Sequence, residues 1–322
     1  MLLTWTKFVI LLILVYIFGT RATKSADIIA EKKKLARVFM GVVFISMITS
    51  FPELFTGISA AAIVKSADLA VGEIIGSCVF NLLIIALIEG VFRKKKLYIH
   101  QKKGDIMPLG FSFIMVSLLT LFLSLNFSVT IFNVGIFSLM IFVFYIVFLR
   151  ILFKERKITI EIELYKNKSL KPEIINFIIS GLVIIGIGIY LPVVGKEIAE
   201  VMNWSESFVG VIFLAFVTSF PELVVSISTV RIGAFDMFLG NIAGSNLFNI
   251  AIIFLIDIFY LKGDVLLDLS PVNMTCGIIA MMMNFIVIFA LVRKSSYKVF
   301  NLISINALLL VMLYMLNLII LI

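Results

Sequence analysis

The sequence predicts an all-α polytopic membrane protein with ten transmembrane helices, arranged as two inverted repeats of five helices each. Three observations lead to this fold class. Of the 322 residues, 62% are hydrophobic and only 14% are charged, the apolar residues gather in long runs, and the second half of the chain repeats the first. Soluble domains are roughly 45–50% apolar and about 25% charged. The composition therefore excludes an ordinary soluble enzyme, a disordered chain and a nucleic-acid-binding protein.

Ten apolar runs are long enough to cross a bilayer. A spanning helix needs about 20 mainly apolar residues, and we expect helices because lipid offers no hydrogen-bond partner to an open backbone. The basic residues follow the first run, whereas a signal peptide has its basic end first, so we expect this run to be the first span. The runs cover residues 3–20, 38–63, 69–92, 106–125, 130–152, 173–195, 206–230, 235–261, 271–292 and 297–321.

The basic residues predict an orientation. If the N-terminus lies outside, 23 of the 27 Lys and Arg residues fall in loops on the cytoplasmic side. Such a bias is what the positive-inside rule describes. We therefore expect a multi-pass protein of the cell membrane with both termini outside and loop 153–172 in the cytoplasm.

An internal repeat divides the chain. Residues 39–64 match residues 208–233 with 13 identities in 26, and residues 68–89 match residues 236–257 with 11 in 22. Because each half contains an odd number of spans, the second copy is inverted, an architecture of transporters whose sites lie near the midplane. The predicted organisation is a first five-helix repeat, a cytoplasmic linker and a second repeat, over residues 1–153 (motif 39–89), 154–172 and 173–322 (motif 208–257).

Two glutamates stand at equivalent positions of the repeats inside apolar runs. Glu53 and Glu222 each follow a Thr-Ser-Phe-Pro block. A charged residue at a helix centre costs about 2.5–3.5 kcal/mol on insertion scales, so an accidental pair is a poor explanation. Pro52 lacks a backbone N–H and disfavours helix in the residue before it, which predicts a break in the helix and free carbonyl oxygens lining a cavity.

Hydroxyl and amide side chains accompany both glutamates. Thr49 and Ser50 lie one turn before Glu53 on the same helix face, and Ser77 and Asn81 are four residues apart on the next run. The second half repeats this pattern at Thr218, Ser219, Ser245 and Asn249. These are hard oxygen donors, which suit Ca²⁺ and the similarly sized Na⁺ and argue against zinc, copper or iron. We expect these two ions and the lipid bilayer as partners, and no cofactor, nucleic acid or protein partner.

The other acidic residues of the apolar runs and the two cysteines are interpreted without a role in ion binding. Glu73 is matched by Asn241, and we expect a solvated carboxylate near the outer end of its span. Glu89 and Asp257 match each other near helix ends, where we expect anchoring. Cys78 and Cys276 form neither a zinc motif nor a disulfide framework and are expected in the core.

These blocks resemble those of the sodium/calcium exchangers of the calcium/cation antiporter superfamily, which carry a G-T-S-x-P-E-like block and a G-N-x-x-G-S-N-like block in each of two inverted repeats. The resemblance implies an ion site between the repeats and movement of spans one and six against the other eight. It places side-chain ligands at Thr49, Ser50, Glu53, Ser77, Thr218, Ser219, Glu222 and Ser245, further polar groups at Asn81 and Asn249, and backbone carbonyls at Ser46 and Ala215.

The sequence departs from this family pattern at five positions. Ile48 and Val217 replace the leading Gly of each block, Glu73 replaces an Asn, and Cys78 replaces the second Asn of its block. Asn249 stands where potassium-dependent relatives usually carry Asp, which argues against coupling to K⁺. The two glutamates are intact.

The leading hypothesis is a secondary antiporter, not an enzyme, that exchanges Ca²⁺ for Na⁺ by alternating access. A Ca²⁺/H⁺ antiporter that uses the same glutamates is the close alternative. A cation channel lined by carboxylates is a third, although paired inverted motifs favour alternating access. An intramembrane enzyme is disfavoured, because the sequence offers no nucleophile–His pair and no metal-binding His motif.

Overall fold

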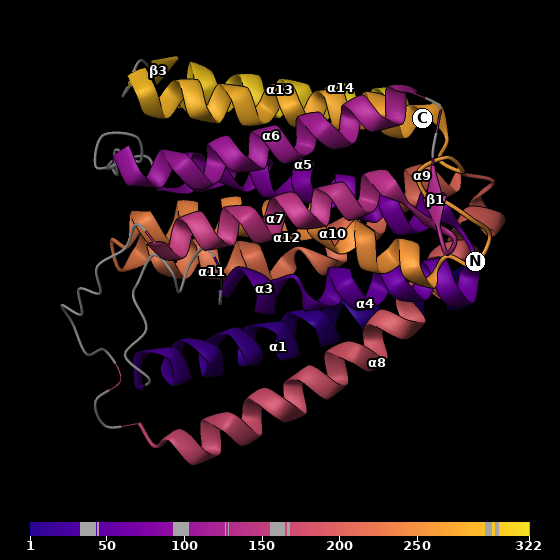
Figure 1. The fold of residues 1–322 in the computed structure, drawn as a ribbon. Coiled ribbons are helices and arrows are strands. Elements are labelled where there is room, and N and C mark those ends of the chain that lie inside the picture. Colours follow the sequence, from indigo (N-terminus) through magenta and orange to yellow (C-terminus); the bar gives the residue numbers. More distant parts are fainter. Residues whose placement is uncertain are drawn as a thin grey trace.

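The computed structural model describes residues 1–32, 43, 45–92, 103–125, 127, 129–154, 165, 168–293, 298–299 and 303–321. Its helices run side by side, and both chain ends lie at the same end of the bundle (Figure 1). Two long helices, α1 (Leu2–Lys32) and α8 (Leu170–Met202), lie along one side of the bundle and pack against each other. Many of their apolar side chains face outward, as expected for helices in contact with lipid.

Two broken helices lie next to this pair. In the first half, α3 (Ser46–Thr49), α4 (Phe51–Ser59) and the π-helical turn η2 (Ala60–Val64) follow one another. In the second half, the order is α9 (Glu206–Phe208), η3 (Val209–Leu214), α10 (Ala215–Thr218) and α11 (Phe220–Arg231). The second chain segment bends by 44° at its break.

Both breaks fall at the serine of the Thr-Ser-Phe-Pro block. Ser50 and Ser219 separate the two helical pieces with nearly the same backbone angles, φ −88° and ψ 13° against φ −83° and ψ 9°. The proline follows within the first turn of the new helix, where its missing N–H is tolerated. The predicted interruption of both helices is therefore confirmed.

The centre of the molecule consists of α5 (Ala67–Val91) and α12 (Phe235–Phe259), which pack against each other and against the broken helices. Nearly all their side chains are buried on every face, as expected for helices surrounded by other helices. Cys78 and Cys276 are both buried and unpaired with each other, as predicted.

Four further helices cover the centre: α6 (Lys103–Leu125), α7 (Ile136–Lys154), α13 (Pro271–Arg293) and α14 (Ile305–Leu321). Two short antiparallel hairpins precede α7 and α14. The first pairs β1 (Thr130–Ile131) with β2 (Val134–Gly135), and the second pairs β3 (Lys298–Val299) with β4 (Ile303–Ser304).

The matched acids Glu89 and Asp257 fasten these hairpins to the ends of the central helices. Glu89 accepts hydrogen bonds from the backbone N–H of Ser304 at 2.7 Å and from its hydroxyl at 2.9 Å. Asp257 accepts from the backbone N–H of Gly135 at 2.7 Å and of Val265 at 2.9 Å. Their position near the ends of α5 and α12 agrees with the anchoring role expected from the sequence.

Six helices of the described chain are long and apolar enough to cross a membrane, and α9 to α11 form a seventh span if the bent segment is counted as one. Three shorter apolar helices remain, over Phe51–Val64, Ile136–Leu152 and Ile305–Leu321. A helical membrane protein is thus established, while the count of ten spans stays a prediction. Most of the predicted cytoplasmic linker lies outside the described residues.

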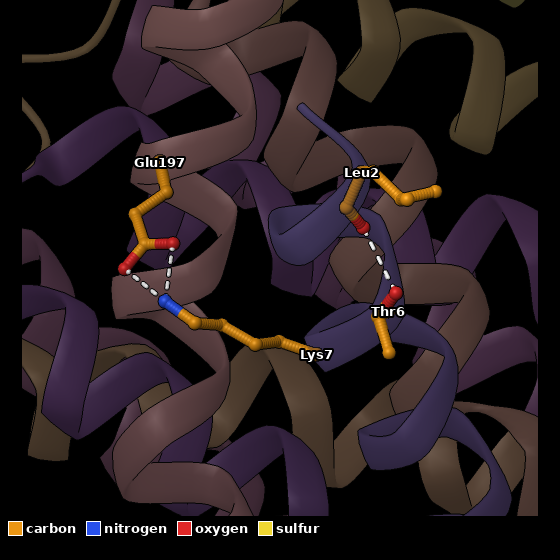
Figure 2. A network of polar contacts seen from close by, with 4 residues as sticks. All are labelled: Leu2, Thr6, Lys7 and Glu197. Atoms are coloured by element: carbon orange, nitrogen blue, oxygen red, sulfur yellow. Dashed lines mark hydrogen bonds and ion pairs between the residues drawn. The ribbon is translucent and has the colours of Figure 1, made fainter.

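Contacts hold α1 to α8 and to the linker. Lys7 on α1 donates to both carboxylate oxygens of Glu197 on α8, at 2.9 and 2.8 Å (Figure 2). Near the opposite end of α1, Ser25 donates to Glu173 at 2.9 Å. Tyr165 of the linker donates its hydroxyl to Asp27 at 2.8 Å. Burial, together with the nearby Asp27 carboxylate, raises the pKa of this phenol, so the hydroxyl remains a donor.

Candidate functional site

The two broken helices bring their repeated Thr-Ser-Phe-Pro-Glu blocks together through crossed hydrogen bonds. The hydroxyl of Ser50 donates to Oε1 of Glu222 at 3.2 Å, and the hydroxyl of Ser219 donates to Oε1 of Glu53 at 3.1 Å. All four side chains are fully buried. Each repeat therefore supplies the serine that holds the carboxylate of the other, and the two bonds are related by the internal repeat.

The central helices add a second pair of repeat-related contacts. The hydroxyl oxygens of Thr49 and Ser245 lie 3.3 Å apart, and those of Ser77 and Thr218 lie 3.4 Å apart. Ser245 also donates to Oε1 of Glu222 at 3.2 Å. The structure thus gathers the eight predicted side-chain ligands, from the two broken helices and the two central helices, into one buried cluster.

Several oxygens of this cluster have no hydrogen-bond partner among the described residues. They include Oε2 of Glu53, Oε2 of Glu222 and Oδ1 of Asn81. Neither side-chain atom of the Asn249 amide has a partner within the same ranges. A buried polar group without a partner costs about 1–3 kcal/mol, and more if it is charged. A cation bound to these oxygens would remove that cost.

The starts of α4 and α11 stabilise the two carboxylates of the cluster. Glu53 and Glu222 lie in the first turns of α4 and α11, where backbone N–H groups and the helix dipole stabilise negative charge. Ends of discontinuous helices at a midplane site are a recurring feature of transporters.

The two predicted carbonyl ligands already take part in helical hydrogen bonds. The carbonyl of Ser46 accepts from the N–H of Ser50 at 3.0 Å and from the hydroxyl of Thr49 at 3.1 Å. The carbonyl of Ala215 accepts from the N–H of Ser219 at 3.0 Å. Ion binding there would compete with these bonds, so the role of both carbonyls stays a prediction.

Asn81 enters the site in a way that its sequence motif does not reveal. Its amide nitrogen donates to the side-chain oxygen of Asn246 at 3.0 Å, and Asn246 in turn donates to the carbonyl of Cys78 at 3.3 Å. Asn246 and Cys78 occupy equivalent repeat positions but differ in chemistry. A search for residues shared by the repeats therefore misses Asn246, which helps to join α5 to α12.

The prediction for Glu73 is wrong. Its side chain is fully buried rather than solvated, and the hydroxyl of Thr218 donates to its Oε1 at 2.7 Å. Electrostatic repulsion links Glu73 to both Glu222 and Glu53. The helix end had suggested water, but η3 and its neighbours pack over this part of α5. A third carboxylate therefore borders the predicted ligands.

The acidic groups do not form a metal site by themselves. In the ranges given above, no group of three or more His, Cys, Asp or Glu side chains is arranged to hold a metal ion. Hydroxyl and amide oxygens would have to complete any ligand set. That donor chemistry suits Ca²⁺ or Na⁺ better than a transition metal.

A family comparison agrees with this chemistry. The model of the sodium/calcium exchanger protein family matches residues 3–154 and 173–322. The chain belongs to the sodium/calcium exchanger family. The matched segments omit only the predicted linker region and the first residues, so the family membership covers both repeats.

Individual relatives are distant but extend over most of the chain. The uncharacterized membrane protein MJ0091 of Methanocaldococcus jannaschii is 27% identical over 248 residues, which are 76% of this chain and 77% of that protein. The sodium/calcium exchanger MaX1 of Methanosarcina acetivorans is 24% identical over 281 residues, 71% of this chain and 75% of its own.

A solved exchanger shares the fold. The structure of the sodium-calcium exchanger NCX_Mj soaked with 100 mM Na⁺ and 10 mM Sr²⁺ aligns over 98% of both chains with a TM-score of 0.64 and 22% sequence identity. At this identity the likeness establishes a common membrane fold. This member of the exchanger family is therefore a multi-pass cation transporter, and its ion specificity must be argued from its own residues.

Proposed function

We propose that this chain is an antiporter that exchanges Ca²⁺ for Na⁺ at one site between its two repeats. The observation that carries the proposal is the crossed pair of bonds in which Ser50 orients Glu222 and Ser219 orients Glu53. Two carboxylates, each held by the opposite repeat, balance the charge of one Ca²⁺. The same oxygens serve Na⁺, so the two ions exclude each other.

Exchange then needs only that the occupied site opens to one side of the membrane at a time. The pair of helices α1 and α8 lies against the broken helices and is the proposed moving part. Cation loading neutralises the buried carboxylates, whereas an empty site would leave charges in a low dielectric at a cost of several kcal/mol per ion. The transporter with an empty site therefore switches slowly between its two open forms, and Ca²⁺ moves only in exchange for another cation.

The test is the uptake of radioactive Ca²⁺ into proteoliposomes. Vesicles loaded with Na⁺ are diluted into Na⁺-free medium, beside vesicles that carry only a pH gradient. We expect uptake driven by the Na⁺ gradient and abolished in Glu53→Gln and Glu222→Gln. The matched control is Glu200→Gln, which removes an exposed carboxylate from α8 and should transport normally.

Each other outcome has a defined meaning. Uptake driven only by the pH gradient would replace Na⁺ with H⁺ as the coupling ion. Single-channel currents would contradict an antiporter. Near-normal transport by both glutamine variants, with size-exclusion profiles like the parent protein, would contradict the site.

A further inference from the structure

Asn246 lies between the two central helices and differs in chemistry from its repeat counterpart. It is fully buried on α12, and Cys78 holds the equivalent position on α5. Each side chain donates to the backbone carbonyl of the other residue, the Asn246 amide nitrogen at 3.3 Å and the Cys78 thiol at 3.9 Å. The contact is thus repeated in both directions, but only the asparagine adds a strong acceptor, because a thiol sulfur accepts weakly.

The carbonyl of Cys78 determines which way the Asn246 amide faces. A carbonyl oxygen accepts hydrogen bonds and cannot donate them, so the nitrogen of Asn246 has to face it. The oxygen of Asn246 then faces Asn81, which has to present its own amide nitrogen, at 3.0 Å. The oxygen of Asn81 is therefore the free end of this chain of amides.

That free oxygen belongs with the predicted ion ligands. Oδ1 of Asn81 is buried and has no hydrogen-bond partner among the described residues. Asn81 follows Ser77 by one turn of α5, so the two side chains share a helix face, and the hydroxyl of Ser77 lies 3.4 Å from that of Thr218. An amide oxygen binds a hard cation, whereas the N–H groups of a reversed amide would repel it.

The other repeat lacks this arrangement. Asn249 is the counterpart of Asn81, and neither atom of its amide has a partner within the described ranges. Cys78 stands where a second asparagine would have offered an oxygen to the Asn249 nitrogen. Among the described residues, no hydrogen bond therefore fixes which end of the Asn249 amide faces the site.

We propose that Asn246 is a positioning residue that turns the amide of Asn81 so that its oxygen, and not its nitrogen, faces the bound Ca²⁺. The proposal rests on the proposed function and deepens it. The two amides of the site are then unequal ligands, because Asn81 is oriented before the ion arrives and Asn249 is oriented only by the ion. The affinity for Ca²⁺ should therefore depend on Asn246, which acts through Asn81.

The experiment measures equilibrium binding of radioactive Ca²⁺ to the purified protein at fixed pH without Na⁺. Asn246→Cys copies the residue of the other repeat and removes the acceptor. We expect it to raise the half-saturating Ca²⁺ concentration about 10-fold. The matched control Asn284→Cys removes another fully buried amide, which joins α13 to Ser112 of α6 at 2.9 Å. It should lower the melting temperature in the same way and leave the affinity for Ca²⁺ unchanged.

A second background separates amide orientation from packing. In Asn81→Asp both terminal atoms of the side chain are oxygens, so no amide polarity remains to be set. We expect Asn246→Cys to change the half-saturating Ca²⁺ concentration less than about 2-fold in this background, because the two effects are coupled. A packing defect would weaken binding equally in both backgrounds.

Two results would overturn the proposal. They are an unchanged affinity for Ca²⁺ in folded Asn246→Cys, and an equal loss of affinity with and without Asn81→Asp. Asn246→Ala also lacks the acceptor and takes the place of Asn246→Cys if that variant does not fold.

The readout does not depend on the coupling ion. Ca²⁺ binding with the expected dependence on Asn246, but without Na⁺-driven uptake, would contradict the proposed function and leave the role of Asn246 standing. A folded parent protein that binds no Ca²⁺ would overturn both proposals.

Discussion

Ser50 and Ser219 hold the carboxylates of the opposite repeat, at 3.2 and 3.1 Å. A hydrogen bond to a charged group contributes about 1.5–3 kcal/mol. The serines act before any ion arrives, because they fix Oε1 of each carboxylate and leave Oε2 directed to a partner that the described chain does not supply. Each glutamate is thus oriented for a ligand by a residue more than 160 positions away.

Removal of either serine hydroxyl should weaken Ca²⁺ binding to a similar extent. We expect Ser50→Ala and Ser219→Ala each to raise the half-saturating Ca²⁺ concentration roughly 10-fold, at the low end of the hydrogen-bond range. The measurement is initial uptake at graded Ca²⁺. Ser228→Ala is the matched control, because that hydroxyl bonds only the carbonyl of Val224 on an exposed face. A large effect in one serine variant and none in the other would contradict the paired arrangement.

The residues of the site differ in how far the sequence predicts them. The eight predicted side-chain ligands can be found from the sequence, because a charged or hydroxyl side chain in an apolar run needs a reason and each has a duplicate in the other repeat. Asn246 and Glu73 have chemically different counterparts, Cys78 and Asn241, so comparison of the repeats leaves them out. The burial of Glu73 depends on packing by η3, which its distance from the helix end does not reveal.

At the level of elements, α1 and α8 touch the broken helices through glycines at equivalent positions. A Cβ at Gly19 would lie 2.6 Å from Cγ of Pro221, and one at Gly188 would lie 2.6 Å from Cβ of Phe55. Because neither glycine carries a side chain, α1 and α8 can lie directly against the helices that carry Glu222 and Glu53. Such close contacts between small residues let helices pack tightly in a membrane.

A side chain at either glycine should slow transport more than it weakens binding. We expect Gly188→Ala to lower the maximal rate about 10-fold, through roughly 1–3 kcal/mol of overpacking, with a nearly unchanged half-saturating Ca²⁺ concentration. Gly186→Ala on the same helix is the control, because a Cβ there meets nothing within 4 Å. The measurement is the Ca²⁺ dependence of exchange, with thermal stability in detergent checked alongside. Equal effects of both variants would contradict a role for the close contact.

The contacts between α1 and α8 predict that these helices move as one body. Lys7 and Glu197 join them toward one end, and Ser25 and Glu173 toward the other (Figure 2 shows the first pair). Cross-linking of a Lys7→Cys and Glu197→Cys pair with a flexible thiol reagent should therefore leave exchange largely intact. The native cysteines are buried, so background reaction should be low. Loss of exchange on cross-linking, followed by recovery of exchange when a cleavable cross-linker is cut, would show that the helices move apart.

Across the whole molecule, the two ends of the chain lie at the same end of the bundle (Figure 1), which agrees with an even number of spans. The sequence predicts a helical membrane protein well, because long apolar runs need about 20 residues to cross a bilayer and lipid restricts the backbone to helices. It predicts the shorter pieces less well. The hairpins before α7 and α14 lie within apolar runs, and the acids Glu89 and Asp257 that fasten them show their partners only in three dimensions.

The predicted orientation can be tested on intact cells. Single cysteines at Lys262 and Lys168, both exposed, should react with a membrane-impermeant maleimide from opposite sides. We expect labelling of Lys262→Cys in intact cells, and of Lys168→Cys only after permeabilisation. The reverse pattern would place the basic loops outside, against the positive-inside rule.

The unequal pair of Glu73 and Asn241 also affects how the molecule rests between turnovers. If the two inverted repeats were identical in sequence, they would exchange conformations between the inward-open and the outward-open form. These two forms would then have equal free energies. One extra carboxylate in a single half removes that equality. A free-energy difference of only about 1.4 kcal/mol between the two forms changes the ratio of their populations about tenfold. Between turnovers, such an exchanger would be predominantly open to one side of the membrane. Its forward and reverse turnover would differ in ion affinity, although the same ions are exchanged.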